Sequence, residues 1–245
     1  MQDTAQIPFE FFSPEIPSFS NFVVGDNVEA VTLLTALASN KTAISTGQKP
    51  HAAYVIWGGP GVGKSHLLTA FASAASAASA ASASGLRVTR LSADATFPDD
   101  PFVETDVLCV DNADRLSLEQ QAWLFTAFNH VAQSGGSTVA TGRSAPGLWP
   151  MRDDIRTRMG SGLTLEILPI PQDGMAQALS QYAASRGFSI SQEVLAYLLS
   201  HAPRDLTTLC QTLTGIDRMS LAQKRAVTIP LLRAFLTQSN DRNNP

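Results

Sequence analysis

Up to about residue 168, short apolar runs alternate along the chain with segments in which apolar residues recur at helical spacing. Beyond residue 168 only the helical spacing remains. Short apolar runs that stop at turn signals predict β-strands, and apolar residues three to four positions apart predict helices. The predicted strands cover 54–57, 87–91, 107–110, 137–141 and 164–168, and the predicted helices cover 27–37, 66–84, 118–133 and 153–159. This alternation predicts an α/β fold with a parallel five-stranded sheet flanked by helices.

After Pro169-Ile170-Pro171 the sequence pattern predicts only helices and no further strands. Helices are predicted at 173–186, 191–202, 205–219 and 229–238, with Pro230 in the first turn of the last one. We therefore predict a domain boundary at this point. The predicted parts are a proline-containing N-terminal tail at 1–17, an α/β nucleotide-binding domain at 18–168 and a small all-helical lid domain at 169–245.

An alanine- and serine-rich run extends the predicted helix after residue 66. Serine recurs every third residue from Ser73 to Ser82, so on a helix of 3.6 residues per turn the serines drift around the axis and form no fixed face. Alanine is the strongest helix former. The run predicts an exposed helical extension that ends near Gly85, and no function is assigned to it.

The first predicted strand ends in a glycine-rich loop with the spacing Gly-x-x-x-x-Gly-Lys-Ser. Such a loop folds its backbone N–H groups around phosphates, and the following helix adds its N-terminus. Lys64 is expected to reach the β- and γ-phosphates, and Ser65 is expected to hold Mg²⁺. The predicted nucleotide-binding residues here are Gly58, Gly59, Pro60, Gly61, Val62, Gly63, Lys64, Ser65 and His66.

An apolar strand at 107–110 ends in Asp111. An acid in this place, downstream of a phosphate loop, is typical of the Walker B position, so Asp111 is predicted to act on the Mg²⁺ side. The next residue is Asn112, where many ATPases of this class have an acid that orients the attacking water. Asparagine can hydrogen-bond a water molecule but cannot take its proton, so slow intrinsic hydrolysis is expected.

Two further polar positions are weaker candidates. Thr141 ends an apolar strand, where it either contacts the γ-phosphate or serves a turn. Arg156-Thr157-Arg158 precedes Met159-Gly160, and this pattern alone indicates a solvated basic face.

Composition narrows the classes of function. The chain has 245 residues, 44 % of them hydrophobic, and a net charge of −4, which argues for a globular protein and against a non-specific nucleic-acid coat. Cys109 and Cys210 lie in apolar stretches and are expected to be buried thiols in a reducing compartment. No signal peptide and no membrane-spanning run is visible, so a cytoplasmic location is expected. The histidines are scattered and indicate no metal site.

Several segments together resemble the bacterial replication initiator DnaA and its AAA+ relatives. The resemblance runs from about Phe19 to Leu236, and the chain is expected to stop where DnaA continues into a helix-turn-helix domain. Within this family the chain is most similar to the regulatory inactivators of DnaA, the Hda group. The segments that carry the resemblance are 19–27 (FSNFVVGDN), 57–58 (WG), 64–68 (KSHLL), 110–112 (VDN), 216–220 (IDRMS) and 224–230 (KRAVTIP).

The tail supports the same group, because Gln6-Ile7-Pro8-Phe9-Glu10-Phe11 resembles the peptide that docks on the DNA polymerase III sliding clamp. Gln6 would hydrogen-bond in a polar notch. Ile7, Phe9 and Phe11 would fill an apolar groove. The short pattern alone is weak evidence for clamp binding, and the AAA+ domain that follows it strengthens this interpretation.

The resemblance implies a mechanism. A chain that holds ADP or ATP with Mg²⁺ binds the DNA-loaded clamp and meets ATP-bound DnaA. Its arginine finger, which falls on Arg158, then completes the ATP site of DnaA, and hydrolysis inactivates the initiator. DNA is contacted only through the clamp, no membrane is involved, and the sequence leaves open whether the chain forms a homo-oligomer.

Two departures from the wider group affect nucleotide sensing. The sensor-2 arginine would fall near Thr207, and Arg204, one turn earlier, is the candidate replacement. The sensor-1 region reads Thr141-Gly142-Arg143, where relatives often have an acid. The alternatives are a helicase loader of the DnaC type, which would lack the 6–11 peptide, and a metabolic P-loop kinase, which gives no reason for a helical lid.

Overall fold

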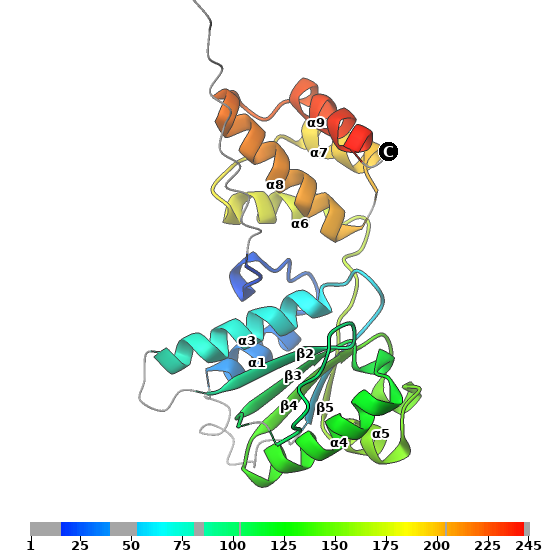
Figure 1. The fold of residues 1–245 in the computed structure, drawn as a ribbon. Coiled ribbons are helices and arrows are strands. Elements are labelled where there is room, and N and C mark those ends of the chain that lie inside the picture. Colours follow the sequence, from blue (N-terminus) through cyan, green and yellow to red (C-terminus); the bar gives the residue numbers. More distant parts are fainter. Residues whose placement is uncertain (1–15, 40–52, 81–85, 103, 204, 243–245) are drawn as a thin grey trace, which may run out of the picture.

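A parallel sheet organises the larger domain, and Figure 1 shows helices stacked on both of its faces. The computed structural model describes residues 16–39, 53–80, 86–102, 104–203 and 205–242. Neighbouring strands are parallel and follow the order β2-β3-β4-β1-β5. The predicted five-stranded α/β fold is confirmed. The strands are β1 (Ala53–Trp57), β2 (Val88–Ser92), β3 (Val107–Asp111), β4 (Ser137–Gly142) and β5 (Leu163–Glu166).

Each face of the sheet has its own hydrophobic core. Helices α1 (Val28–Ala38) and α3 (Lys64–Ala80) cover one face, and α4 (Leu118–Gln133) and α5 (Asp153–Gly160) cover the other. Because the central strands are covered on both sides, β1 and β3 consist of near-continuous apolar runs, and β4, which also contains Ser and Thr, is buried along its whole length. Short 3-10 helices lie in the connections: η1 (Phe19–Asn21), η2 (Ala113–Arg115) and η3 (Pro146–Leu148).

Four helices after residue 170 form the lid, which lies at one end of the molecule in Figure 1. They are α6 (Met175–Ser185), α7 (Gln192–His201), α8 (Leu206–Gln223) and α9 (Ile229–Arg242). Their apolar stripes meet in a third core, which includes the fully buried residues Leu179, Leu195 and Leu213. Val23, just after η1, also packs into this core, so the N-terminal segment joins the two domains.

Asn27 fixes the place where the chain leaves the sheet domain for the lid. Its side-chain amide donates to the carbonyl oxygen of Leu168 at 3.0 Å and accepts from the N–H of Leu168 at 2.8 Å. Asn27 is only 4 % exposed, whereas Leu168 is 43 % exposed, so these bonds are partly shielded from water. The domain connection is therefore held by a pair of hydrogen bonds from one buried side chain.

The alanine- and serine-rich extension differs from the sequence-based expectation. Helix α3 continues to Ala80, but Ala72 is 2 % exposed and Ala75 is 0 % exposed. Both belong to the core that includes Leu34 and Ala38 of α1. The prediction of an exposed extension is wrong for these alanines, because a side chain as small as alanine lets α1 approach closely. Ser73 and Ser76 do face solvent. No helix in the described ranges is long and apolar enough to cross a membrane.

Candidate nucleotide-binding site

The glycine-rich loop lies between β1 and α3, and its backbone requires glycine at specific places. Gly58 and Gly63 have φ angles of 155° and 95°, which side-chain-bearing residues rarely adopt. A Cβ on Gly58 would lie 2.4 Å from the carbonyl oxygen of Ile167, and one on Gly63 would lie 2.7 Å from the ring of Phe22. Glycine at these two positions therefore allows the loop to turn closely at the N-terminus of α3, a place that favours an anion.

Lys64 is folded back onto this loop. Its ammonium donates to the carbonyl oxygens of Gly58 at 2.9 Å and Gly59 at 2.6 Å. Burial lowers the pKa of Lys64, whereas the carboxylates of Asp114 and Asp111 act to raise it. A phosphate in the loop would take the place of the two carbonyl oxygens as acceptor and supply a full negative charge.

The residues predicted to hold Mg²⁺ lie together. The Ser65 hydroxyl donates to the carboxylate of Asp111 at 3.0 Å. A hydroxyl and a carboxylate oxygen are hard donors that suit Mg²⁺, which keeps several waters and shares its remaining positions with nucleotide phosphates. Within the described ranges no group of three or more His, Cys, Asp or Glu residues forms a cage for a metal of its own. This pair therefore fits a metal that arrives with the nucleotide.

The hydroxyl of Thr141 forms hydrogen bonds with residues at the end of β3. Its hydroxyl donates to Asp111 at 2.5 Å and accepts from the backbone N–H of Asn112 at 2.8 Å. Thr141 is fully buried, so the structure places it beneath Asp111. Asn112 itself lines the cavity and has a left-handed backbone, with φ of 54°. Its side chain carries an amide at the position where an acid would act as a base.

A cavity of about 730 Å³ opens beside the loop, between the sheet domain and the lid. This volume suits a nucleotide-sized ligand. Lys64, Ser65 and Asn112 are among its polar residues, and Phe22 with residues of α6 and α8 forms much of the remaining wall. Sequence reasoning missed these other walls, because they come from segments that are far from the loop. They include Asn21, Phe22, Val23, Tyr182, Leu206, Cys210 and Thr214.

His66 holds the N-terminal segment over the loop. Its Nε2 lies 2.9 Å from the carbonyl oxygen of Ser18, and its ring lies 5.5 Å from that of Phe22. Burial lowers the pKa of His66, and the Ser18 carbonyl partly opposes this shift. A neutral imidazole can still donate to that carbonyl. The residue thus lines the cavity and also positions Phe22.

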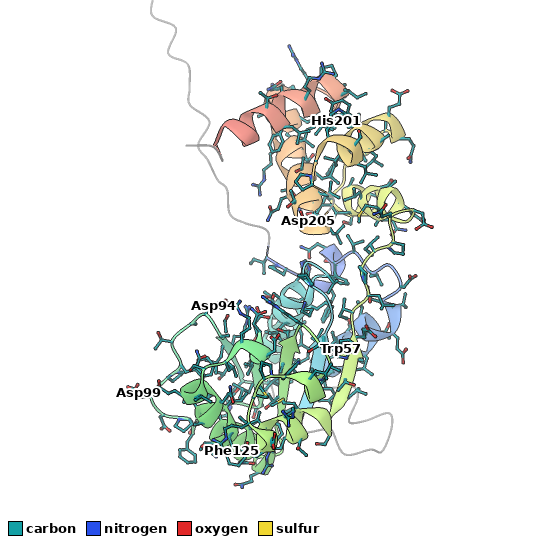
Figure 2. The ribbon with its side chains drawn as sticks, turned by 90° about the vertical axis from the view of Figure 1, so that its right-hand side faces the viewer. Trp57, Asp94, Asp99, Phe125, His201 and Asp205 are labelled. Carbon is teal, nitrogen blue, oxygen red and sulfur yellow. The ribbon has the colours of Figure 1, made fainter. Side chains whose placement is uncertain are left out.

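Arg158 lies outside this cavity. It occupies the last turn of α5, and its guanidinium carbon is 5.1 Å from the ring centroid of Phe125 and 5.8 Å from that of Phe128. Phe125 appears in Figure 2 at the end of the sheet domain that is remote from the lid. Arg156 instead forms an ion pair with Asp153 in the same helix. The two arginines therefore have different surroundings.

Several predicted site residues lie outside the described residues. These are Arg204 and the tail residues Gln6, Ile7, Phe9 and Phe11. Asp205, the neighbour of Arg204, caps α8 by accepting from the N–H of Thr208 at 2.8 Å. Figure 2 shows Asp205 at the end of the lid that faces the sheet domain, whereas His201 lies farther away.

A phosphate loop on a five-stranded parallel sheet, with a helical lid across the cavity, defines a P-loop nucleotide-binding protein of the AAA+ class. Residues 15–166 match the family model of the bacterial DnaA ATPase domain, and residues 172–236 match the model of the Hda lid domain. Since the first match alone spans more than half of the chain, the protein belongs to the DnaA-related AAA+ family, and it carries an Hda-type lid.

Solved structures agree with this fold. Domain III of the replication initiation protein DnaA from Thermotoga maritima superposes with a TM-score of 0.67 at 19 % identity, over 92 % of this chain and 97 % of that one. AMPPCP-bound DnaA from Aquifex aeolicus gives 0.66 at 20 % identity, over 84 % of this chain and 66 % of that one. The RuvB branch migration motor of Thermotoga maritima gives 0.57 at 16 % identity, over 86 % and 68 %.

Proposed function

We propose that this protein is a negative regulator of replication initiation that stimulates hydrolysis of DnaA-bound ATP. In this proposal it acts in the cytoplasm, holds a nucleotide itself and binds the DNA-loaded sliding clamp, so it meets DNA only through the clamp. The observation that carries the proposal is the combination of a DnaA-type ATPase domain with an Hda-type lid. A second support is Arg158, which lies outside its own nucleotide cavity.

The proposed ligand is ADP or ATP with Mg²⁺. Lys64 would contact the phosphates, while Ser65 and Asp111 would hold the metal, whose charge offsets that of the phosphates. The AMPPCP-bound relative supports a nucleotide in this place. Because Asn112 cannot accept a proton from water, the proposed intrinsic ATPase activity is weak.

Arg158 is the proposed arginine finger that acts on DnaA. Arginine suits this task because it remains charged and its planar fork matches two phosphate oxygens at once. Its guanidinium lies against Phe125, and no carboxylate among the described residues forms an ion pair with it. A charge without an acidic partner among the described residues is available to a phosphate of another subunit.

The decisive test measures conversion of DnaA-bound ATP to ADP with DNA-loaded clamp present. Arginine fingers contribute about 10³- to 10⁵-fold in rate, so Arg158→Ala should reduce the stimulated rate to near background. Arg156→Ala is the matched control: this arginine is in the same helix but pairs with Asp153, so its loss should have little effect. Thermal melting and ADP binding should be unchanged in both. Full stimulation by Arg158→Ala would remove the finger role from this residue.

The clamp part of the proposal is tested in the same assay. Changing Gln6 and Phe9 together to alanine should abolish clamp binding and clamp-dependent stimulation while ADP affinity stays constant. Undiminished clamp binding by this variant would contradict the proposed docking peptide. Capture of a replicative helicase instead of clamp and DnaA would favour the helicase-loader alternative.

A further inference from the structure

Two stacked rings on the outside of the lid have no role in the proposed function. They belong to Tyr197 and His201, four residues apart on α7, and their centroids lie 3.9 Å apart with the ring planes inclined by 9°. Nδ1 of His201 also lies 2.9 Å from the carbonyl oxygen of Tyr197, which fixes the orientation of the imidazole. Because His201 is exposed, the stack is accessible to a further ring from outside.

Arg233 of α9 brings a positive charge to the edge of this stack. Its Nε donates to the Tyr197 hydroxyl at 3.2 Å, and its guanidinium carbon lies 5.7 Å from the centroid of the Tyr197 ring. The side chain is exposed, and no carboxylate among the described residues forms an ion pair with it. Tyr197, His201 and Arg233 are called the lid platform below. An ordered guanidinium beside stacked rings suits a ligand that carries both an acid and an aromatic ring.

The connection between β2 and β3 offers the complementary chemistry. Its segment 94–106, called the acidic loop below, contains five acidic residues and no lysine or arginine. Asp94 and Glu104 form ion pairs with neighbouring arginines. Asp99 and Asp100 are exposed, and neither forms an ion pair within the described part of the chain. These two carboxylates are therefore available to a cation of a partner.

An exposed aromatic ring lies beside these carboxylates. The ring belongs to Phe102, which is 60 % exposed and meets the ring of His130 edge-on at a centroid distance of 5.5 Å. The backbone N–H of Phe102 donates to the carboxylate of Asp100 at 2.8 Å. Phe97 anchors the same loop, because its ring packs against that of Trp123 at 5.1 Å. The acidic loop thus presents a phenyl ring and uncompensated acids together.

The lid platform and the acidic loop lie far apart in one molecule. Figure 2 shows His201 in the part of the lid that is remote from the sheet domain, and Asp99 at the edge of the sheet domain. Net charge divides in the same way: from Pro169 onward seven Lys and Arg against five Asp and Glu give +2, so the rest of the chain, whose total is −4, carries −6. Complementary charge favours contact between the two surfaces, and because they do not meet within one chain, the contact requires a second copy.

We propose that the lid platform of one copy binds the acidic loop of a second copy. In this contact Phe102 stacks on His201, and Asp99 or Asp100 pairs with Arg233. The contact joins two different surfaces, so each pair of copies keeps one free surface at either end and can add further copies. It is small and polar, so the association is weak and decreases with salt. The inference goes beyond the proposed function and requires neither nucleotide, clamp nor DnaA.

The test is sedimentation velocity of the full chain over a series of protein concentrations. The average mass of the wild type should rise with concentration and fall when salt is added. Arg233→Glu and Phe102→Ala should each reduce the association constant about tenfold or more, because one reverses the pairing charge and the other removes the stacking ring. Arg225→Glu is the matched control: it makes the same charge change at an exposed arginine of the lid outside the platform, and its association constant should stay within about twofold of wild type.

A mixture of two variants tests whether these two surfaces bind each other. Arg233→Glu keeps an intact acidic loop and Phe102→Ala keeps an intact lid platform, so an equimolar mixture should form a dimer with one copy of each and no larger species. Thermal melting should show both variants folded, because both side chains are exposed. A wild type that stays monomeric, an equal loss in Arg225→Glu, or a mixture without the mixed dimer would overturn the inference. Binding of a single-stranded oligonucleotide that Arg233→Glu abolishes, by a monomeric wild type, would assign the lid platform to nucleic acid instead.

Discussion

Replacing Lys64 with alanine should weaken ADP binding about 30- to 150-fold. The ammonium of Lys64 has two carbonyl oxygens as acceptors in the structure, and phosphate binding exchanges these neutral acceptors for a charged one. A hydrogen bond to a charged group contributes about 2 to 3 kcal/mol, and each 1.4 kcal/mol corresponds to about a factor of ten in affinity. Isothermal titration with Mg-ADP measures the change directly.

The variant should remain folded, which makes its loss of binding interpretable. Because burial lowers the folded-state pKa of Lys64, the charged form is disfavoured by folding at neutral pH, and this cost disappears only as pH rises through the lowered pKa. Removal of the ammonium is therefore expected to leave the melting temperature equal or slightly higher. Equal ADP affinity of wild type and Lys64→Ala would refute the assignment of the phosphate loop, whatever the melting temperatures.

Two further predictions test the cavity and the domain connection. Burial raises the pKa of Cys210 to about 12, so labelling of its thiol by a small maleimide should be slow and should accelerate about tenfold per pH unit from pH 7 to 9. Saturating Mg-ADP should suppress this labelling, because Cys210 lines the cavity. Cys109 is fully buried and should not react, and unprotected labelling of Cys210 would place the nucleotide elsewhere. Asn27→Ala should lower the free energy of unfolding by about 2 kcal/mol in urea titrations, since it removes two partly buried hydrogen bonds to the backbone of Leu168. An unchanged midpoint would contradict the importance of this contact.

Elements with complete local signals were predictable from the sequence. Helix α4 has the predicted bounds, and Ser117 and Gln120 form a capping box at its start. The Ser117 N–H donates to the side-chain oxygen of Gln120 at 2.9 Å, and the Gln120 N–H donates to the Ser117 hydroxyl oxygen at 3.2 Å. The alanine- and serine-rich run shows where such signals fail. Its composition predicts a helix correctly. The burial of Ala75 depends on packing against α1, and the spacing of residues within the run does not indicate that another helix packs there.

The candidate site divides in the same way. The phosphate loop is a continuous segment whose glycines carry its geometry, so its pattern alone predicts its form. The cavity walls come from η1, α6 and α8, which are brought together by tertiary contacts such as the third core, the bond of His66 to Ser18 and the contact between Asn27 and Leu168. The turn after β4 likewise depends on packing, because a Cβ on Gly142 would lie 2.4 Å from the indole of Trp149.

Arg156 and Arg158 illustrate why packing is needed to interpret charge. Two arginines separated by one residue in a short basic segment indicate a solvated face, and nothing in the pattern distinguishes them. In the folded helix, Arg156 has Asp153 three residues earlier as its partner, so its charge is largely compensated. Arg158 lies against Phe125 and Phe128, where aromatic faces hold a guanidinium in place without neutralising it. A guanidinium that is ordered and has no ion pair among the described residues loses little conformational entropy when it binds phosphate. This property makes Arg158 the better candidate for action on a partner.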